Sequence, residues 1–336
     1  MKKIISGILV LTMVLSACSC QKKQVEEAVV EPEKKVEKPL TTNEFYEKMS
    51  TSTARPVAVM IDNDSGLARP QSGIENAYAV YEIMVEGAAT RLMALFLDSK
   101  AEKIGPVRSS RHYFLDYVME HGALYAHCGF SPQASSDISA LGINNINEIT
   151  SNNGKNFYRD RSQKAPHNLY TSMPELVDSA KGLGYKTEKD TDRVFTYNTE
   201  CKPLEKGTAA SEILLPYSGA YGVSYTYNEE TKLYERYVNG APHKSRTLED
   251  VISVKNILIY KVKNYSIDDV GRQNIENIGS GDGFYVTEGK YIPIKWSKSG
   301  RSAKTEYKTE SGEALNINPG NTFVQIMPVT SEITLS

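Results

Sequence analysis

The change of pattern near residue 194 constrains the fold of this chain more than any other feature. Before it, short apolar runs such as 57–61 alternate with segments of helical period such as 112–120. After it, helical periods disappear, and Tyr, Thr and Val alternate between turn signals such as Asn239-Gly240. The sequence therefore predicts an α/β fold, a mixed sheet with flanking helices, followed by a smaller β-rich second domain.

Turn and cap signals place the expected elements. In the first half we expect strands at 56–61 and 123–130, a hairpin of 77–86 and 90–98, and helices at 112–120, at 173–181 and for about ten residues from Pro132. A helix through 77–98 is the alternative, because Met, Leu and Ala permit it. In the second half we expect a hairpin of 221–227 and 233–238, then strands at 257–262, 283–286, 291–296, 305–308 and 322–327.

The first 17 residues have the form of a lipoprotein signal peptide. Two lysines precede an apolar run at 4–15, which is too short to span a bilayer. The run ends in Leu15-Ser16-Ala17-Cys18, which resembles the bacterial lipoprotein processing box. That resemblance implies a lipidated Cys18 as the mature N-terminus and a protein anchored on the outer face of the cytoplasmic membrane. An ordinary signal peptide with a chance cysteine is the alternative.

Composition divides the rest of the chain into a tether and a folded part. Residues 18–44 are rich in Lys, Glu, Val and Pro and have no apolar period, so we expect a disordered tether with a short capped helix at its end. The remainder is long enough for two domains, an α/β domain at 45–192 and a β-rich domain at 193–336. The 39 Lys and Arg balance 41 Asp and Glu, so no net field attracts nucleic acid.

The stretch 104–111, IGPVRSSR, joins an expected strand to an expected helix. Gly105 and Pro106 end the strand, and Ser109 or Ser110 is a suitable N-cap for the helix. Arg108 and Arg111 would then lie beside a helix N-terminus, which favours an anion the size of a phosphate or carboxylate. The alternative is that each arginine pairs with a nearby Asp or Glu and holds a loop.

A long polar loop at 152–170 is the second candidate region. Loops of this length in compact domains are often functional. It carries a crowded polar set, namely Arg159, Asp160, Arg161, His167 and Asn168, of which Asp160, His167 and Asn168 are candidate site residues. The remaining candidate ligand-binding residues are Arg69, Glu86 and Arg91, which with Arg108, Ser109 and Arg111 complete the predicted site.

We expect no cofactor and no metal site. His121 and His127 lie six residues apart, which matches neither one helix face nor a known ligand pair. Cys128 and Cys201 could form a disulfide in an exported protein, or both could be small buried residues, and the sequence leaves the two open.

Several motifs together resemble a known family. They are RPVAVMIDN at 55–63, ARPQSG at 68–73, EG at 86–87, TR at 90–91, IGPVRS at 104–109, APHNLY at 165–170, YER at 234–236, NG at 239–240, GSG at 279–281 and NPGNT at 318–322. The chain is similar in these to the YerB-like lipoproteins, a domain-of-unknown-function family of Gram-positive bacteria. The resemblance implies a two-domain, membrane-anchored exported lipoprotein, without an established reaction.

Two functions of different classes follow. The first is a binding or scaffold module in which the arginine stretch and the polar loop form one site for an anionic envelope ligand or a protein partner. It is favoured because no nucleophile–base–orienter set is visible. The second is a cell-envelope enzyme acting on phosphate-linked polymers or polyprenyl phosphates, as a weaker likeness to the LytR-CpsA-Psr ligases implies. In it, Glu86, Asp160 or His167 would act as acid or base.

Overall fold

The computed structural model describes residues 37, 39–150 and 156–336. Residues 36–336 form one compact unit, and the following account concerns that unit. The predicted signal peptide, Cys18 and almost all of the predicted tether lie outside the described residues. In the part that the structure describes, no helix is long and apolar enough to cross a membrane.

The described residues contain few helices. The α-helices are α1 (Thr42–Thr51), α2 (Phe114–Glu120), α3 (Pro132–Ala140) and α4 (Met173–Gly182), and the 3-10 helices are η1 (Ile74–Asn76) and η2 (Glu86–Ala88). Thr41 and Glu44 cap α1 reciprocally, and Ser131 caps α3 with Pro132 in its first turn. The short capped helix at the end of the tether and the helix from Pro132 are therefore confirmed.

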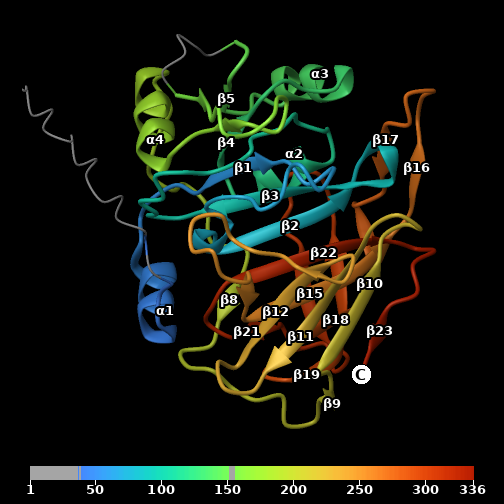
Figure 1. The fold of residues 1–336 in the computed structure, drawn as a ribbon. Helices are drawn as coiled ribbons and strands as arrows, with labels where there is room; N and C mark the ends of the chain where they lie inside the picture. Colours follow the sequence, from blue (N-terminus) through green and yellow to red (C-terminus); the bar gives the residue numbers. More distant parts are fainter. Residues whose placement is uncertain (1–36, 38, 151–155) are drawn as a thin grey trace, which may run out of the picture. The chain divides into compact units, whose positions relative to one another are not determined.

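One large mixed sheet runs through the unit (Figure 1). Its order is β20-β19-β18-β15-β22-β2-β3-β1-β4-β5, and β9 pairs with β19. The strands are β1 (Val57–Ile61), β2 (Ala79–Met84), β3 (Thr90–Phe96), β4 (Leu124–His127), β5 (Asn145–Asn147), β9 (Thr208–Ala209), β15 (Asn256–Val262), β18 (Gly279–Thr287), β19 (Lys290–Lys298), β20 (Glu306–Thr309) and β22 (Thr322–Pro328). β22 is parallel to both β15 and β2, so strands from both halves of the chain share this sheet.

The other strands form smaller sheets. The second sheet contains β10 (Glu212–Pro216), β11 (Gly222–Asn228), β12 (Leu233–Val238), β13 (Ala241–Pro242), β14 (Ser253–Val254) and β23 (Thr334–Leu335). Three two-stranded sheets pair β6 (Tyr158–Arg159) with β7 (Leu169–Tyr170), β8 (Thr196–Tyr197) with β21 (Asn316–Ile317), and β16 (Asn264–Ser266) with β17 (Gln273–Ile275).

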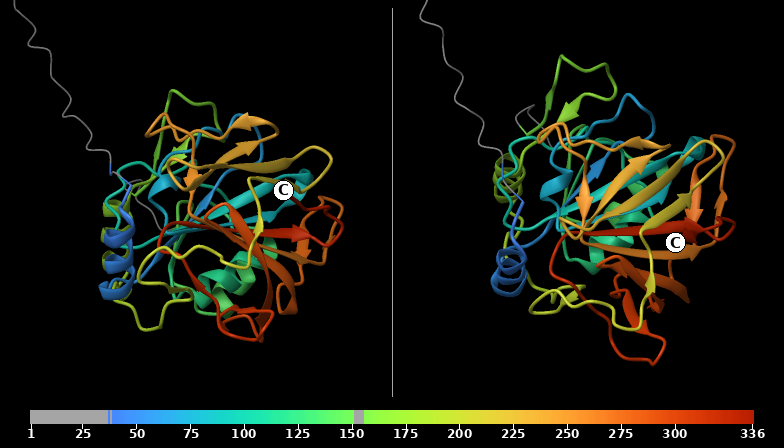
Figure 2. Two further views of the ribbon diagram at one scale, coloured as in Figure 1. Left: turned by 90° about the horizontal axis from the view of Figure 1, so that it is seen from below. Right: turned by 60° about the horizontal axis from the view of Figure 1, so that its bottom comes forward.

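Both faces of the central part of the large sheet are covered. β1 and β3 are buried at every position, because successive side chains enter two different cores. One core packs Val59 and Phe323 against α4 and against Tyr225 of the second sheet. The other packs Met60 against α1, α2 and α3. In both views of Figure 2, α1, coloured blue, lies at the margin of this unit.

The sequence predicted the fold class correctly. The α/β class, the mixed sheet with flanking helices and the β-rich second half are confirmed. The hairpin reading of residues 77–98 is confirmed over the helical alternative, since β2 and β3 pair antiparallel. The division into domains at 45–192 and 193–336 stays a prediction.

The predicted cap of the helix at 112–120 is wrong. α2 begins at Phe114 after Tyr113, which makes no side-chain cap bond. Ser110 lies in an extended segment instead, where its amide donates to Gly129 O and its hydroxyl accepts a hydrogen bond from Tyr125. Because the chain stays extended through 108–110, neither serine can reach the first turn of the helix.

Candidate functional site

The candidate site lies at one edge of the large sheet. β1, β2 and β4 all end there, and antiparallel β3 begins there, since Ile61 pairs with Leu92 and Met84 with Thr90. Residues that follow parallel strands meet at such an edge, which is where open α/β sheets bind ligands. This arrangement gathers Asp62 after β1, Glu86 after β2 and Arg91 in β3.

The arginine stretch runs across the same edge. Arg108 N donates to Met60 O and Cys128 N donates to Arg108 O, so the stretch is held between the ends of β1 and β4. Gly105 turns it inward with φ 146°. A Cβ at Gly105 would lie 2.7 Å from Leu169 O, so the backbone of the 152–170 loop packs directly on this glycine.

Arg108 joins two carboxylates and a histidine. Its Nε lies 3.1 Å from Asp62 Oδ2, and its Nη2 donates to Asp64 Oδ2 at 2.8 Å. His167 Nδ1 lies 2.8 Å from the same Asp62 Oδ2. Burial would raise the pKa of Asp64, but the hydrogen bond and charge of Arg108 outweigh it and lower that pKa. The side chain of Arg108 remains 23 % exposed, and its Nη1 has no hydrogen bond to a described residue.

Arg111 and Arg91 lie deeper. Arg111 forms a two-pronged ion pair with Glu86, with Nε 2.9 Å from Oε2. Burial would raise the pKa of Glu86, but the bond and charge of Arg111 lower it to about 2. Arg91 donates to Ser109 O at 2.8 Å, and no described carboxylate lies within ion-pair distance of it. Burial and the charge of Arg111 lower the pKa of Arg91 to about 10, so this guanidinium stays charged at neutral pH.

The other predicted residues are placed around this cluster. Asp160 pairs with Lys103 at 2.6 Å, and Asn168 accepts a hydrogen bond from Arg159. The hydrogen bond from Lys103 is the largest cause of the lowered pKa of Asp160. Arg69 donates to both oxygens of Asn63, beside Asp62. Asp160 is thus held in an ion pair away from the carboxylates of the Arg108 cluster.

The arginines are therefore largely paired with acids, as the alternative reading of 104–111 expected. The predicted serine cap is wrong, but Arg111 lies beside the start of α2, since Phe114 N donates to Arg111 O, and an anion site at this helix N-terminus stays a prediction. Sequence reasoning missed Asp64 as a site residue. The signal was present, since Asp62-Asn63-Asp64 directly follows an apolar strand.

A polar network extends from the site into the interior. Gln71 donates to Asp62 O and accepts from His243, whose other ring nitrogen receives a hydrogen bond from Arg236. Arg236, which is 0 % exposed, then donates to Glu82 Oε2 at 2.8 Å. The network ties β2 of the first half to β12 of the second.

Three of these side chains could hold a metal ion. One ligand atom each from Asp62, Asp64 and His167 lie within 4.8 Å of one another. Carboxylate and imidazole donors suit divalent cations. The Arg108 guanidinium contacts both carboxylates, so it already supplies the positive charge that a metal ion would bring to them.

A pocket of about 380 Å³ opens above Arg108. Its lining joins the arginine stretch, the end of β4 and the polar loop, namely Val107, Arg108, Ser109, Cys128, Gly129, Phe130, Ile149, Arg159, Pro166 and Leu169. Phe130 and Ile149 are 41 % and 66 % exposed and give it an apolar wall. Cys128 donates to Glu148, and both Cys128 and Cys201 are free thiols.

Comparison with known families decides the chain's relationship. Two family models match, the DUF3048 protein of unknown function N-terminal domain at residues 41–186 and its C-terminal domain at 213–324. The chain belongs to this family. The resemblance seen in the sequence motifs is thereby confirmed.

The chain is also similar to a protein of Bacillus subtilis (strain 168), YerB, which is named as a candidate lipoprotein. The two are 30% identical over 319 residues, which cover 95% of this chain and 93% of YerB. The crystal structure of the YerB protein from Bacillus subtilis superposes with a TM-score of 0.77 at 26% identity, covering 89% of this chain and 100% of that one. The B. subtilis protein shares the fold, and neither the family description nor the name of this relative states a reaction.

Proposed function

We propose that this chain is an exported lipoprotein that binds an anionic ligand in the pocket above Arg108. The anchor rests on the processing box at Cys18 and on the name of the B. subtilis relative. Two or three acyl chains on one cysteine would hold the protein firmly at the outer face of the membrane. A Cys18→Ser chain tests the anchor, because it should no longer be recovered in the membrane fraction. Recovery of this variant in the membrane fraction to the same extent as the wild type would contradict the anchor.

The pocket lining is the observation that carries the binding proposal. Two guanidiniums, Arg108 and Arg159, line it, and Arg159 has no ion pair with a described carboxylate. Asp62 and Asp64 hold the Nε and Nη2 atoms of Arg108 and so fix the orientation of its guanidinium. Nη1 stays without a partner among the described residues and is available to a ligand. Guanidinium donors in a fixed orientation favour phosphate or carboxylate. The apolar wall favours a ligand that carries a hydrocarbon part next to its anionic group.

Binding of farnesyl phosphate to the full chain tests this proposal, with farnesol and inorganic phosphate as partial ligands. Loss of one charged hydrogen bond costs about 1.5–3 kcal/mol, so Arg159→Ala should weaken binding of farnesyl phosphate roughly 10- to 150-fold. Arg108→Lys should weaken it too, because an ammonium cannot keep both carboxylate contacts and still reach the ligand.

Arg161→Ala is the matched control, since Arg161 is an exposed arginine of the same loop that does not line the pocket. Its affinity should equal that of the wild-type chain. Equal affinity of wild type, Arg159→Ala and Arg108→Lys would reject the site and return these arginines to a structural role.

A second candidate function is a cell-envelope enzyme acting on phosphate-linked substrates, and one contact favours it. His167 Nδ1 bonds to the fully buried Asp62, which leaves Nε2 available to move a proton. Glu86 and Asp160, the other expected acid–base residues, are both held in ion pairs. Release of phosphate from farnesyl diphosphate, lost in His167→Asn but not in Arg161→Ala, would favour the enzyme. Absence of turnover with and without Mg²⁺ or Mn²⁺ would reject it.

A further inference from the structure

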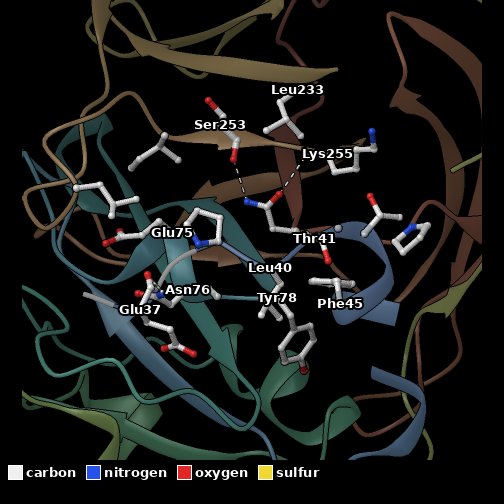
Figure 3. A pocket seen from close by; sticks show the side chains of 18 of the residues that line it. Glu37, Leu40, Thr41, Phe45, Glu75, Asn76, Tyr78, Leu233, Ser253 and Lys255 are labelled. Carbon is white, nitrogen blue, oxygen red and sulfur yellow. Dashed lines mark hydrogen bonds between the residues drawn. The ribbon is translucent and has the colours of Figure 1, made fainter. Parts of the chain in front are cut away.

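A larger pocket, of about 470 Å³, lies away from the arginine site and shares no lining residue with it. Residues 39–42 and α1 form one wall, η1 forms another, and β12 and β14 of the second sheet close the third (Figure 3). Its volume falls in the range of small-molecule sites. Segments from the start, middle and end of the chain meet in it, because Asn321 also belongs to the lining.

The N-terminal wall is held in place by specific bonds. Glu37 Oε2 accepts hydrogen bonds from Ser99 Oγ at 2.8 Å and from Lys100 N at 2.9 Å. The reciprocal cap of Thr41 and Glu44 fixes the start of α1 immediately afterwards. These bonds fix the N-terminal wall of the pocket to the rest of the folded unit.

Glu75 of η1 is the unusual group in this pocket. Both of its carboxylate oxygens are buried, and in the described part of the chain neither has a partner of good hydrogen-bond geometry or an ion pair with a basic residue. The hydroxyls of Ser245 and Thr247 and the backbone amides of Gly73 and Glu75 lie near the carboxylate and counteract part of the effect of burial on its pKa, and Thr247 Oγ1 is itself buried without a partner of good hydrogen-bond geometry. Burial raises the pKa of Glu75. Buried carboxylates are normally paired with a cation, and Glu75 has none among the described residues.

The basic residues around the pocket do not supply that cation. The lining holds four acids and two lysines, namely Glu37, Glu75, Glu235, Asp250, Lys48 and Lys255. Lys255 pairs with Glu288 and also donates to Lys232 O. Lys48 interacts electrostatically with Glu37 and Asp98. An excess of negative charge remains, and the rest of the lining includes the apolar side chains of Leu40, Phe45, Leu233, Leu248 and Ile252.

We propose that this pocket binds a small organic cation, a primary ammonium group on an aliphatic chain. The ammonium would donate to the Glu75 carboxylate and to the hydroxyl of Thr247, and the aliphatic part would lie against the apolar lining. Such a ligand supplies what the pocket lacks, a cation that pairs with the Glu75 carboxylate and offsets the negative charge of the lining. Figure 3 shows Glu75 on one side of the pocket, with Leu40, Phe45 and Leu233 across from it.

Calorimetric titration of the full chain with 5-amino-1-pentanol tests the proposal. The neutral 1,5-pentanediol and the anionic 5-hydroxypentanoate have the same length and complete the probe series. The ammonium should bind at least tenfold more tightly than the diol, and the anion should not bind. Glu75→Gln keeps the shape of the side chain and removes its charge, so it should weaken binding of the ammonium at least tenfold and leave the diol unaffected.

Glu310→Gln is the matched control, because Glu310 is an exposed glutamate in the turn after β20. It should bind the ammonium as the wild-type chain does. Equal binding of the ammonium by wild type and Glu75→Gln, equal affinity for ammonium and diol, or no binding of the ammonium at all would each overturn the proposal. Thermal unfolding of each variant without probe separates loss of the site from loss of the fold. Should Glu75→Gln fail to fold, the titration is repeated with Thr247→Val, which should bind the ammonium more weakly than the wild-type chain does.

Discussion

Arg236 offers the sharpest test of what holds the unit together. Its guanidinium is 0 % exposed and bonds to Glu82 Oε2 at 2.8 Å, to Tyr225 OH at 2.7 Å and to His243. Arg236→Met keeps the length of the side chain but leaves the Glu82 carboxylate without its cation. Breaking a buried ion pair costs about 3–5 kcal/mol, which is a large share of an ordinary protein's stability.

Urea unfolding followed by Trp296 fluorescence and by far-UV circular dichroism measures this cost. Trp296 is the single tryptophan and is buried in β19, so fluorescence reports on the second half of the chain. Because the ion pair joins β2 to β12, both signals should shift together. The double variant Glu82→Gln with Arg236→Met should cost about 1–3 kcal/mol less than the sum of the two single changes.

Arg272→Met is the control for this comparison. Arg272 pairs with Asp268 four residues away, and both side chains are about one-third exposed. Exposed pairs contribute about 0–1 kcal/mol, so this variant should unfold almost as the wild type does. A cost below about 1 kcal/mol for Arg236→Met, or strict additivity in the double variant, would refute the reasoning.

Two further predictions concern the candidate site. Gly105→Ala should lower the free energy of unfolding by about 1–3 kcal/mol, because its Cβ would collide with Leu169 O. Gly300→Ala is the control and should change it little, since a Cβ at Gly300 meets nothing within 4 Å. Thermal unfolding of both variants tests this, and equal unfolding midpoints would contradict the clash. Glu86 has a pKa of about 2 in the folded chain against an ordinary 4.5, so its stabilisation is present above pH 4.5 and is lost as the pH falls towards 2. The stability difference between wild type and Glu86→Gln should therefore shrink over that interval in urea titrations, and a difference that grows on acidification would contradict it.

Local pattern was sufficient for much of the fold. The run at 56–61 is apolar throughout and the run at 90–98 is apolar between Arg91 and Asp98, and the strands that they form are buried at every position. The cap before Pro132 was readable because Ser and Pro act within four residues of each other. The cap of α2 was not, since Ser110 is held by a bond to Gly129 after the next strand, a contact that no window around 104–111 contains.

The site was harder to predict for the same reason. Arg108 and Arg111 look alike in the sequence, but the sheet edge places one beside Asp62 and Asp64 and the other beside Glu86. Their pairing depends on strand order, and strand order is set by long-range packing. The Glu75 pocket had no local signal at all, because its walls come from residues more than a hundred positions apart.

The position of β22 has a consequence for the order in which the chain folds. β22 covers residues Thr322–Pro328 and lies between β15 and β2, parallel to both. Until these residues are available, β2 and β15 each present an open edge of unpaired backbone groups, which invites pairing with other chains. Long-range parallel pairing also forms slowly. A chain that is still emerging, or that has lost its last twenty residues, therefore has two separate half-sheets, and only the late arrival of one central strand joins them into a single fold.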